Sequence, residues 1–260
     1  MPHFSDDEIE RYARHLVLAE IGGPGQQKLA AARVMIVGAG GVGGPAALYL
    51  AAAGVGAITL VDPDTVALSN LQRQILFTGA DIGRPKVEAG AERLTALNSM
   101  VDIETRTEPL TTDNARALIA GHDVVLDGTD DFATRLAVNA ACVAEAVPLV
   151  SGALGRWSGQ VGVFAGKPCY RCLVPETPPD AETCARVGVV GALAGVIGAM
   201  AALETIKLIT GAGEPLTGRL LLYEGLSATA RTVRITADPD CPICAGPDRD
   251  QAKARDRRAT

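Results

Sequence analysis

A glycine-rich turn directly after an apolar run is the feature that most limits how this chain can fold. Residues 34–37 are apolar, and Gly38, Gly40, Gly41 and Gly43 follow them in the pattern G-x-G-x-x-G. These glycines would let the backbone turn tightly and approach a phosphate, while the start of a following helix would supply free N–H groups. The pattern therefore predicts a strand, a phosphate-binding loop and a helix at the start of a nucleotide-binding α/β fold.

Apolar runs and helical stretches continue to alternate through the first half of the chain, as in a parallel sheet with crossover helices. The expected strands cover residues 34–37, 58–62, 103–106, 124–127 and 149–151, and the expected helices cover residues 43–53, 86–97, 114–120 and 135–145. Ahead of them, Ser5 and Glu8 match a capping box that opens a helix reaching Leu18. We expect the glycines of residues 22–25 to end that helix, and a short helical piece to follow at residues 26–32.

The second half of the chain has a different pattern. Short strands at residues 160–164, 220–223 and 232–235 are bounded by Gly, Pro and polar turns, which suits antiparallel pairing. Residues 187–203 are uncharged and include four glycines, and we expect them to form a buried helix on the sheet rather than a membrane span. The predicted fold is a Rossmann-like, mostly parallel α/β sheet that continues into an antiparallel second half. The charged residues 248–260 are expected to be a disordered tail.

The composition indicates which kinds of partner the protein is expected to bind. The 260 residues are 48% hydrophobic and 21% charged, with a formal net charge of -6, which disfavours nucleic acid as the main partner. The amino terminus has no apolar run that could serve as a secretory signal, so we expect a cytoplasmic protein with no membrane partner. The thiols of its six cysteines would be reduced there, which favours metal binding over disulfides.

The residues after the glycine loop indicate a triphosphate. Asp62 ends the second expected strand, where a carboxylate can accept hydrogen bonds from ribose hydroxyls. The glycine pattern alone would favour NAD(P), whose diphosphate is largely satisfied by backbone N–H groups. Asn70, Arg73 and Lys86 add an amide and two cations, which cleavage of a triphosphate needs where charge develops. Either cation alone could be an ordinary surface residue, but the set favours a triphosphate that is cleaved.

Two neighbouring carboxylates suggest a magnesium site. Asp130 and Asp131 follow the fourth expected strand, at the edge where open α/β sheets bind ligands. A helix N-cap is the alternative, and both roles are compatible if Asp131 caps the helix while Asp130 faces the metal. His3, His15 and His122 lie outside all these motifs, so no histidine proton relay is expected. Adenylylation of a carboxylate fits that absence, because a carboxylate is already ionised at neutral pH.

The cysteines fall into two pairs and two single residues. The pairs are Cys-x-x-Cys motifs, formed by Cys169 with Cys172 and by Cys241 with Cys244. Two such pairs can complete a tetrahedral, structural zinc site, with redox-active dithiols as the alternative. Cys142 is expected to be a buried residue of an apolar helix.

Cys184 lies in a segment of residues 174–184 that is rich in proline and acidic residues, which predicts an irregular, exposed connection. An exposed thiol beside an acyl-adenylate could accept an acyl group or a persulfide sulfur. Cys184 is therefore a candidate catalytic residue for sulfur transfer.

As a set, these motifs resemble the ThiF/MoeB/HesA family, the bacterial relatives of ubiquitin-activating enzymes. The resemblance covers nearly the whole chain and rests on residues 11–15, 20–22, 25–29, 38–43, 62–64, 69–74, 83–86 and 127–130. It implies that Asp62 holds the ribose, that Asn70, Arg73 and Lys86 hold the phosphates, and that Asp130 lies at the Mg²⁺. Asp64 and Ser69 belong to the same motifs and are expected at the nucleotide site.

The resemblance also implies further partners. Arg14 would reach ATP from the neighbouring subunit of a homodimer, and the cysteine pairs would hold zinc. In one branch of the family a cysteine in the segment of Cys184 takes part in sulfur transfer, whereas other members do not depend on it.

The function we expect is ATP- and Mg²⁺-dependent adenylylation of the C-terminal glycine of a small ubiquitin-like sulfur carrier. This would activate the carrier for thiocarboxylate formation in molybdopterin or thiamine biosynthesis. Residues 1–247 would be one adenylation domain, with a nucleotide half at about 30–152 and a carrier-binding and zinc half at about 153–247. Residues 152–159, with Trp157, would line the groove for the carrier's tail. Sulfur would come from a separate cysteine desulfurase or rhodanese.

Three other functions remain open from the sequence. A tRNA-modifying dehydratase would use the same ATP chemistry, although the overall acidity does not favour it. An NAD(P)-dependent oxidoreductase would need a nicotinamide pocket and a proton donor. A non-catalytic subunit would bind a carrier without activating it, which the presence of Arg73, Lys86 and Asp130 opposes.

Overall fold

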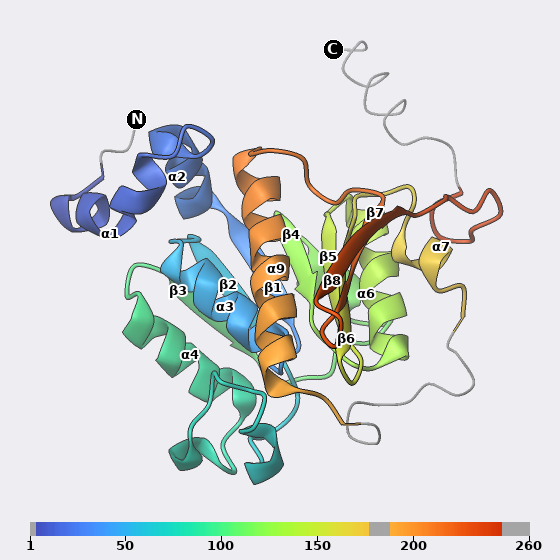
Figure 1. The fold of residues 1–260 in the computed structure, drawn as a ribbon. Helices are drawn as coiled ribbons and strands as arrows, with labels where there is room; N and C mark the ends of the chain where they lie inside the picture. The colour runs from blue at the N-terminus through green and yellow to red at the C-terminus, as the bar shows by residue number, and fades with distance from the viewer. Residues whose placement is uncertain (1–3, 177–187, 246–260) are drawn as a thin grey trace.

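The computed structural model describes residues 4–176 and 188–245, and its centre is one eight-stranded sheet (Figure 1). The strand order is β3-β2-β1-β4-β5-β6-β7-β8. The strands are β1 (Arg33–Val37), β2 (Ala57–Val61), β3 (Asp102–Arg106), β4 (Val124–Asp127), β5 (Leu149–Leu154), β6 (Ser158–Phe164), β7 (Arg219–Glu224) and β8 (Thr229–Arg234). Pairing is parallel from β3 to β5 and antiparallel from β5 to β8, so the predicted mixed fold class is confirmed.

Helices cover both faces of the parallel part. Outside the sheet the chain forms α1 (Asp6–Leu16), α2 (Gly22–Ala31), α3 (Gly43–Ala52), α4 (Lys86–Leu97), α5 (Ala115–Ile119), α6 (Phe132–Glu145), α7 (Tyr170–Leu173) and α9 (Gly191–Thr210), with single 3-10 turns at Leu68–Asn70 and Gly79–Asp81. Successive residues of β1 enter two different cores: Val34 and Ile36 pack with α3, α4 and α9, whereas Met35 and Val37 pack with α5 and α6. Burial on both faces explains why β1 and β2 are continuous apolar runs.

The register of the parallel strands brings the functional motifs to one edge. Val37 pairs with Val61 on one side and with Asp127 on the other, and Asp127 in turn pairs with Ser151. One row at the carboxyl edge of the sheet therefore contains the residues that directly follow β1, β2 and β4, together with the middle of β5. From β1, the next strands β2 and β3 are added on one side of the sheet, and β4 and β5 are added on the other side. Open α/β sheets bind ligands at the carboxyl edge beside this change of side, here between β1 and β4.

Helix α9 crosses the face of the sheet that carries α3 and contacts α2, β4, β5 and β6 (Figure 1). A Cβ at Gly198 would lie 2.5 Å from the Val42 carbonyl oxygen, so a glycine is needed for this close approach. Of the helices described, α9 alone has the length and composition of a membrane span. Its buried Glu204 pairs with Lys207 at 2.6 Å and accepts the Leu216 N–H at 2.7 Å, which indicates a core helix, as predicted.

Element boundaries were partly wrong in the prediction. The capping box of Ser5 and Glu8 is confirmed, but residues 22–25 do not end a helix, because they form the first turn of α2. Pro24 fits there because the first N–H groups of a helix have no acceptor within the helix. Helix α6 begins at Phe132 rather than residue 135, and β8 begins three residues before its predicted start. Most of the segment 174–184 and the whole tail 248–260 lie outside the described residues.

Candidate active site

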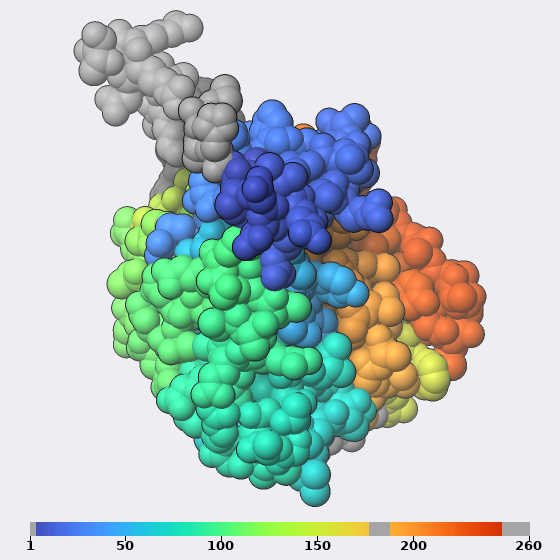
Figure 2. Space-filling model, turned by 90° about the vertical axis from the view of Figure 1, so that its left-hand side faces the viewer, coloured from blue at the N-terminus to red at the C-terminus, as the bar shows by residue number. Residues whose placement is uncertain are grey.

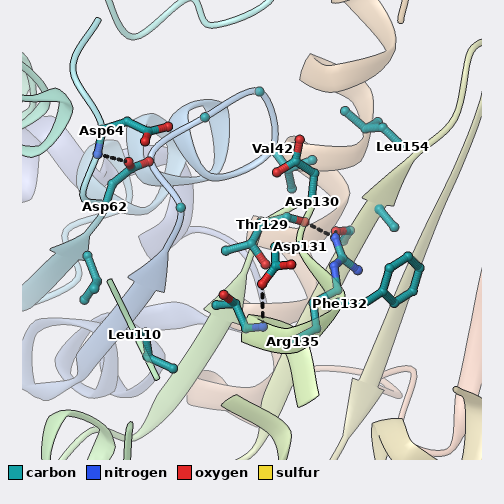
Figure 3. Close-up of a pocket in the computed structure, with 18 of the residues that line it drawn as sticks. Val42, Asp62, Asp64, Leu110, Thr129, Asp130, Asp131, Phe132, Arg135 and Leu154 are labelled. Carbon is teal, nitrogen blue, oxygen red and sulfur yellow. Dashed lines mark hydrogen bonds between the residues drawn. The ribbon is translucent and has the colours of Figure 1, made fainter. Parts of the chain in front are cut away.

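A cavity of about 570 Å³ lies at the carboxyl edge of the sheet, between the ends of β1, β2, β4 and β5 (Figure 3). Its lining includes Gly38, Gly40, Gly41, Asp62, Asp64, Asn70, Arg73, Lys86, Asp130 and Asp131, which are ten of the predicted site residues. Asp62 and Asp64 lie on one side of the view, and Asp130, Asp131 and Arg135 lie on the other. The fold thus brings together residues from five separate segments of the chain.

The glycine loop forms one wall of the cavity. Gly38 has a φ of +87°, in the left-handed region that favours glycine. A Cβ at Gly43 would lie 1.8 Å from the carbonyl oxygen of Gly38, so the loop can close only with glycine at this position. Gly43 does not line the cavity, and its contribution is to the loop's shape and to the start of α3.

Asp62 connects this loop to the end of β2. Its carboxylate is buried and accepts the N–H of Ala39 at 2.8 Å and the N–H of Asp64 at 2.9 Å. Burial raises the pKa of Asp62, while Lys86 and the two backbone hydrogen bonds act in the opposite direction. A carboxylate oxygen has more than one acceptor position, so Asp62 can still accept from a ligand.

Lys86 is the first residue of α4, and its side chain is only 7% exposed. Its ammonium lies 2.7 Å from Asp64 Oδ2 and 3.9 Å from Asp62 Oδ2. The backbone supports this position, because the Lys86 N–H donates to the Asp64 carbonyl at 2.9 Å. A buried cation facing the cavity is therefore held next to two carboxylates.

Arg73 and Asn70 come from the turn around Leu68–Asn70. The guanidinium of Arg73 donates to the Ser69 carbonyl at 3.0 Å, and the Asn70 side chain accepts the Ala67 N–H at 3.1 Å. Ser69 itself does not line the cavity, so its visible contact with the site is the carbonyl that holds Arg73.

Asp131 and Asp130 differ in role. Asp131 caps α6 by accepting the Thr134 N–H at 2.7 Å, which confirms the N-cap alternative for this residue (Figure 3). Partial burial raises the pKa of Asp131, but the hydrogen bonds from Thr134 outweigh it, and the pKa lies below its usual value. Asp130 is exposed on the cavity wall, where a carboxylate could bind Mg²⁺.

Sequence reasoning missed Arg135, which also lines the cavity although it is only 5% exposed. Its guanidinium donates to the carbonyls of Thr129 and Gly152, the latter at 2.8 Å, and so connects the end of β4 to β5. Burial acts to lower the pKa of Arg135, but Asp127 and Tyr170 raise it above its usual value. A buried-type position occupied by an arginine in a mostly apolar helix was the available signal.

Gln74 and Asp127 were also missed. Gln74 lines the cavity, is 5% exposed, and has a buried Oε1 without a hydrogen-bond partner among the described residues. Asp127 Oδ1 accepts from the backbone N–H and hydroxyl of Thr129, while its buried Oδ2 has no partner within residues 4–176 and 188–245. Both belong to motifs quoted in the resemblance, which was the signal that could have marked them.

Arg14 lies far from the cavity of its own chain. It is exposed on α1, which packs on α2, and α2 leads into the amino end of β1. In Figure 2 the N-terminal helices (blue) occupy the top of the molecule, and the segment around residues 65–85 (cyan to teal) occupies the bottom. Arg14 could therefore reach a nucleotide only in another copy of the chain.

The four paired cysteines converge. The Sγ atoms of Cys169, Cys172, Cys241 and Cys244 all lie within 4.8 Å of one another. The Cys169–Cys241 separation is 3.7 Å and the Cys172–Cys244 separation is 3.4 Å, near the edge of about 3.8 Å that four sulfurs at ~2.3 Å from one zinc would have. The four thiols are free, so the cluster could hold a metal ion.

The thiol pKa is shifted in opposite directions at Cys241, which belongs to the cluster, and at Cys142, which does not. Burial acts to raise the pKa of Cys241, but backbone hydrogen bonds from Cys244 and Ile243 lower it to about 7. Cys142 is buried in α6 and does not belong to the cluster, and burial raises its pKa. Cys184 lies outside the described residues.

A second cavity of about 450 Å³ adjoins the first. It is formed by β5, β6, β7 and β8 and shares Ala153, Leu154 and Gln160 with the first cavity. Trp157 does not line it and is 47% exposed. The two cavities therefore meet at Ala153, Leu154 and Gln160, residues of β5 and β6.

Comparisons with known proteins agree with this geometry. A family model described as the ThiF family matches residues 12–243. The chain is 49% identical over 245 residues to the adenylyltransferase and sulfurtransferase MOCS3 of Anopheles gambiae, covering 92% of this chain and 56% of that protein. It therefore spans little more than half the length of that relative.

Two other relatives are matched over nearly their whole length. The sulfur carrier protein adenylyltransferase of Thermus thermophilus is 43% identical, covering 93% of this chain and 92% of that protein. The molybdopterin-synthase adenylyltransferase of Escherichia coli is 45% identical, covering 94% and 99%.

A solved structure of Escherichia coli MccB with ATP has the same fold, with a TM-score of 0.80 at 23% identity, covering 92% of this chain and 75% of that one. The family match extends over most of the chain, and it includes the loop, the cavity residues and three of the four clustered cysteines, Cys169, Cys172 and Cys241. The chain therefore belongs to the ThiF family.

Proposed function

We propose that the chain is an ATP-dependent adenylyltransferase that activates the C-terminal glycine carboxylate of a small ubiquitin-like sulfur-carrier protein. Two relatives matched over nearly their whole length are named as adenylyltransferases, one of a sulfur carrier protein and one of molybdopterin synthase. The observation that carries the proposal is that Arg73, Lys86 and Asp130, from three separate segments, line one cavity with the glycine loop.

In the proposed reaction, a carboxylate oxygen of the carrier attacks the α-phosphorus of ATP. A new P–O bond forms, the bond to the β-phosphate breaks, and pyrophosphate leaves. The carboxylate needs no general base, because it is ionised at neutral pH. The enzyme has to orient the two reactants and neutralise the charge that develops.

The residues of the cavity are suited to these tasks. The N–H groups of the glycine loop and the start of α3 would bind the phosphates. Lys86, as a compact buried charge, and Arg73, as a planar fork, would neutralise the α-phosphate and the departing pyrophosphate. Asp62 would accept the ribose hydroxyls. Gln74 Oε1, which has no partner in the part of the chain that the structure describes, would accept a further N–H or O–H of the nucleotide.

Asp130 is the residue we assign to Mg²⁺, since Asp131 is occupied as the cap of α6. When bound, the ion would neutralise charge on the phosphate oxygens. The four-thiol cluster is assigned to zinc in a structural role, with no open position for a substrate.

The second cavity is the proposed path for the carrier's tail. It opens between the antiparallel strands and joins the nucleotide cavity at Ala153, Leu154 and Gln160. A tail that ends in Gly-Gly has no side chains at its tip, and so could place its carboxylate beside the α-phosphate.

We also propose a homodimer in which Arg14 completes the cavity of the partner subunit. Arg14 is exposed on α1, and the N-terminal helices lie at the opposite end of the molecule from the segment around residues 65–85 (Figure 2), which supports this arrangement. Val17 and Leu18 follow it and are 78% and 45% exposed, as apolar residues of an interface would be in an isolated subunit.

Sulfur would be delivered by a separate protein, a cysteine desulfurase or a rhodanese, to give the carrier thiocarboxylate. Cys184 remains the proposed residue for that transfer. Alanine at Cys184 should leave acyl-adenylate formation unchanged and lower the yield of thiocarboxylate.

Mass spectrometry of candidate carriers tests the proposal. A MoaD-like and a ThiS-like carrier, each with a C-terminal Gly-Gly, are incubated with the enzyme, ATP and Mg²⁺, and each intact mass is measured. We expect one carrier to gain one AMP, which also identifies the pathway, and a carrier shortened by its last glycine to gain none. Absence of an AMP adduct on any such carrier, with the nucleotide bound, would contradict the proposed substrate.

A further inference from the structure

The cysteine cluster and the nucleotide cavity share one short helix. Cys169 is the N-cap of α7, and the next residue, Tyr170, lines the cavity. Helix α7 contains only four residues, too few to be stable without tertiary contacts. The position of Tyr170 therefore depends on what holds Cys169 and Cys172 in place.

A second contact joins the same helix to α6. Asn139 is 1% exposed, accepts the Tyr170 N–H at 2.7 Å, and places its Nδ2 3.5 Å from Cys169 Sγ. Arg135 lies four residues earlier in α6, on the same face of that helix. One side of α6 thus contacts a cluster cysteine with one residue and the cavity with another.

Tyr170 and Arg135 close the connection. Tyr170 is 2% exposed, and its ring packs edge-on against Phe164 with centroids 5.5 Å apart. Tyr170 and Arg135 line the same cavity. Burial raises the pKa of Tyr170, while the positive charge of Arg135 acts to lower it. Arg135 in turn holds the carbonyl of Thr129, the residue before Asp130, and the carbonyl of Gly152 (Figure 3). The chain of contacts thus ends at the loop that carries the proposed Mg²⁺ ligand.

We propose that Asn139, Tyr170 and Arg135 couple the four-cysteine cluster to the nucleotide cavity, so that metal in the cluster and ATP in the cavity each strengthen the binding of the other. The inference rests on the proposed ATP site. Loss of the metal would release α7, withdraw the Tyr170 hydroxyl from Arg135, and loosen the loop of residues 128–131. Coupling of binding free energies is reciprocal, so it can be measured from the metal's side. Tyr170 is a positioning residue in this scheme.

The test measures the zinc Kd of the full-length protein by competition with a zinc-selective chelator, without and with a saturating non-hydrolysable ATP analogue. Nucleotide binding is measured separately by calorimetry. We expect the analogue to lower the zinc Kd about fivefold or more in the wild type. In Tyr170→Phe, which removes only the hydroxyl, the change should be less than about twofold, while the zinc content stays at the wild-type level.

Tyr12→Phe is the matched control. It removes a buried tyrosine hydroxyl that accepts from Asn98 Nδ2 at 2.9 Å, on α1 and away from the cavity. It should keep the full wild-type response. An equal response in Tyr170→Phe and wild type would overturn the inference, and so would an unchanged zinc Kd in a wild type that binds the analogue. A wild type that does not bind the analogue would overturn the proposed function as well.

A second measurement needs no variant. Amide hydrogen exchange of the peptide containing Cys241 and Cys244, which does not line the cavity, should slow when the analogue binds. Partial removal of zinc should speed exchange in residues 128–131. Nucleotide protection confined to cavity-lining peptides would contradict the coupling.

Discussion

The ammonium of Lys86 lies 2.7 Å from the carboxylate of Asp64, which holds the cation at the cavity wall. The lysine side chain is 7% exposed and that of Asp64 is 65% exposed, so the pair has one buried and one solvated partner. The triphosphate would compete with Asp64 for this ammonium. Asp64 is thus positioned to orient Lys86 before the nucleotide arrives.

Variants of this pair should act non-additively. Lys86→Met should lower carrier-dependent ATP–pyrophosphate exchange by about a hundredfold or more, because charge developing on the phosphates loses a preorganised cation. Asp64→Asn should lower the rate of the same exchange about fivefold, which is equivalent to ~1 kcal/mol and fits an ion pair with one solvated partner. In the Lys86→Met background Asp64→Asn should change nothing further, and equal losses in both backgrounds would show that Asp64 acts independently of Lys86.

Arg73 provides the second cation. Arg73→Ala should lower the exchange rate by about a hundredfold or more and leave the metal content of the cysteine cluster unchanged. Arg84→Ala is the matched control, because this arginine lies near the same loops but pairs with Asp81 and Glu92 and does not line the cavity. Exchange that survives Arg73→Ala would show that the phosphate assignment is wrong.

The cap at Asp131 predicts a pH-dependent contribution to stability. The folded-state pKa of Asp131 is lowered, so its stabilising effect is present above the unfolded value, which lies near 3.9, and is lost as the pH falls through the folded value. At pH 7, Asp131→Ala should lower the free energy of unfolding by about 1 kcal/mol.

Asp131→Asn separates the charge from the cap, because it keeps an acceptor for the Thr134 N–H. Thermal unfolding should show a constant Tm difference between wild type and Asp131→Asn from pH 7 to 5, which shrinks below about pH 4. A difference that does not vary with pH would mean that the carboxylate charge contributes nothing.

The cysteine cluster predicts selective metal loss. Cys172→Ser should reduce bound zinc from about one ion per chain to almost none, since a four-thiolate site loses one ligand, and it should lower the Tm. Cys142→Ala should keep the zinc, because Cys142 lies in the apolar core of α6 and α5. Metal analysis by plasma mass spectrometry decides between these outcomes, and equal zinc in both variants would contradict the assignment.

Much of the parallel sheet could be predicted from the sequence, because strands that are buried on both faces appear as continuous apolar runs. The start of β1 differs from its prediction by one residue and its end by none. The start of α2 was missed because glycines and Pro24 usually break helices. Here the packing of α2 against α9, with Lys28 donating to the Thr210 carbonyl at 2.8 Å, stabilises the helix.

The candidate site was predictable where its residues follow strand ends, as for Asp62 and Asp130. The roles of Arg135 and Tyr170 could not be predicted, because they depend on the packing of α7 near α6. Arg135 and Tyr170 are separated by more than thirty positions in the sequence. Tyr170 lies within a Cys-x-x-Cys motif that indicates a metal site, but no local pattern around either residue indicates a contact with the nucleotide cavity.

The central claim is that this cavity cleaves ATP between the α- and β-phosphates to activate a carrier carboxylate. Isotope exchange between pyrophosphate and ATP, measured with and without a Gly-Gly carrier, tests it most directly. We predict exchange that requires both the carrier and Mg²⁺ and is lost in Arg73→Ala. Absence of carrier-dependent exchange, with NADH rather than ATP bound in calorimetric titration, would contradict the claim.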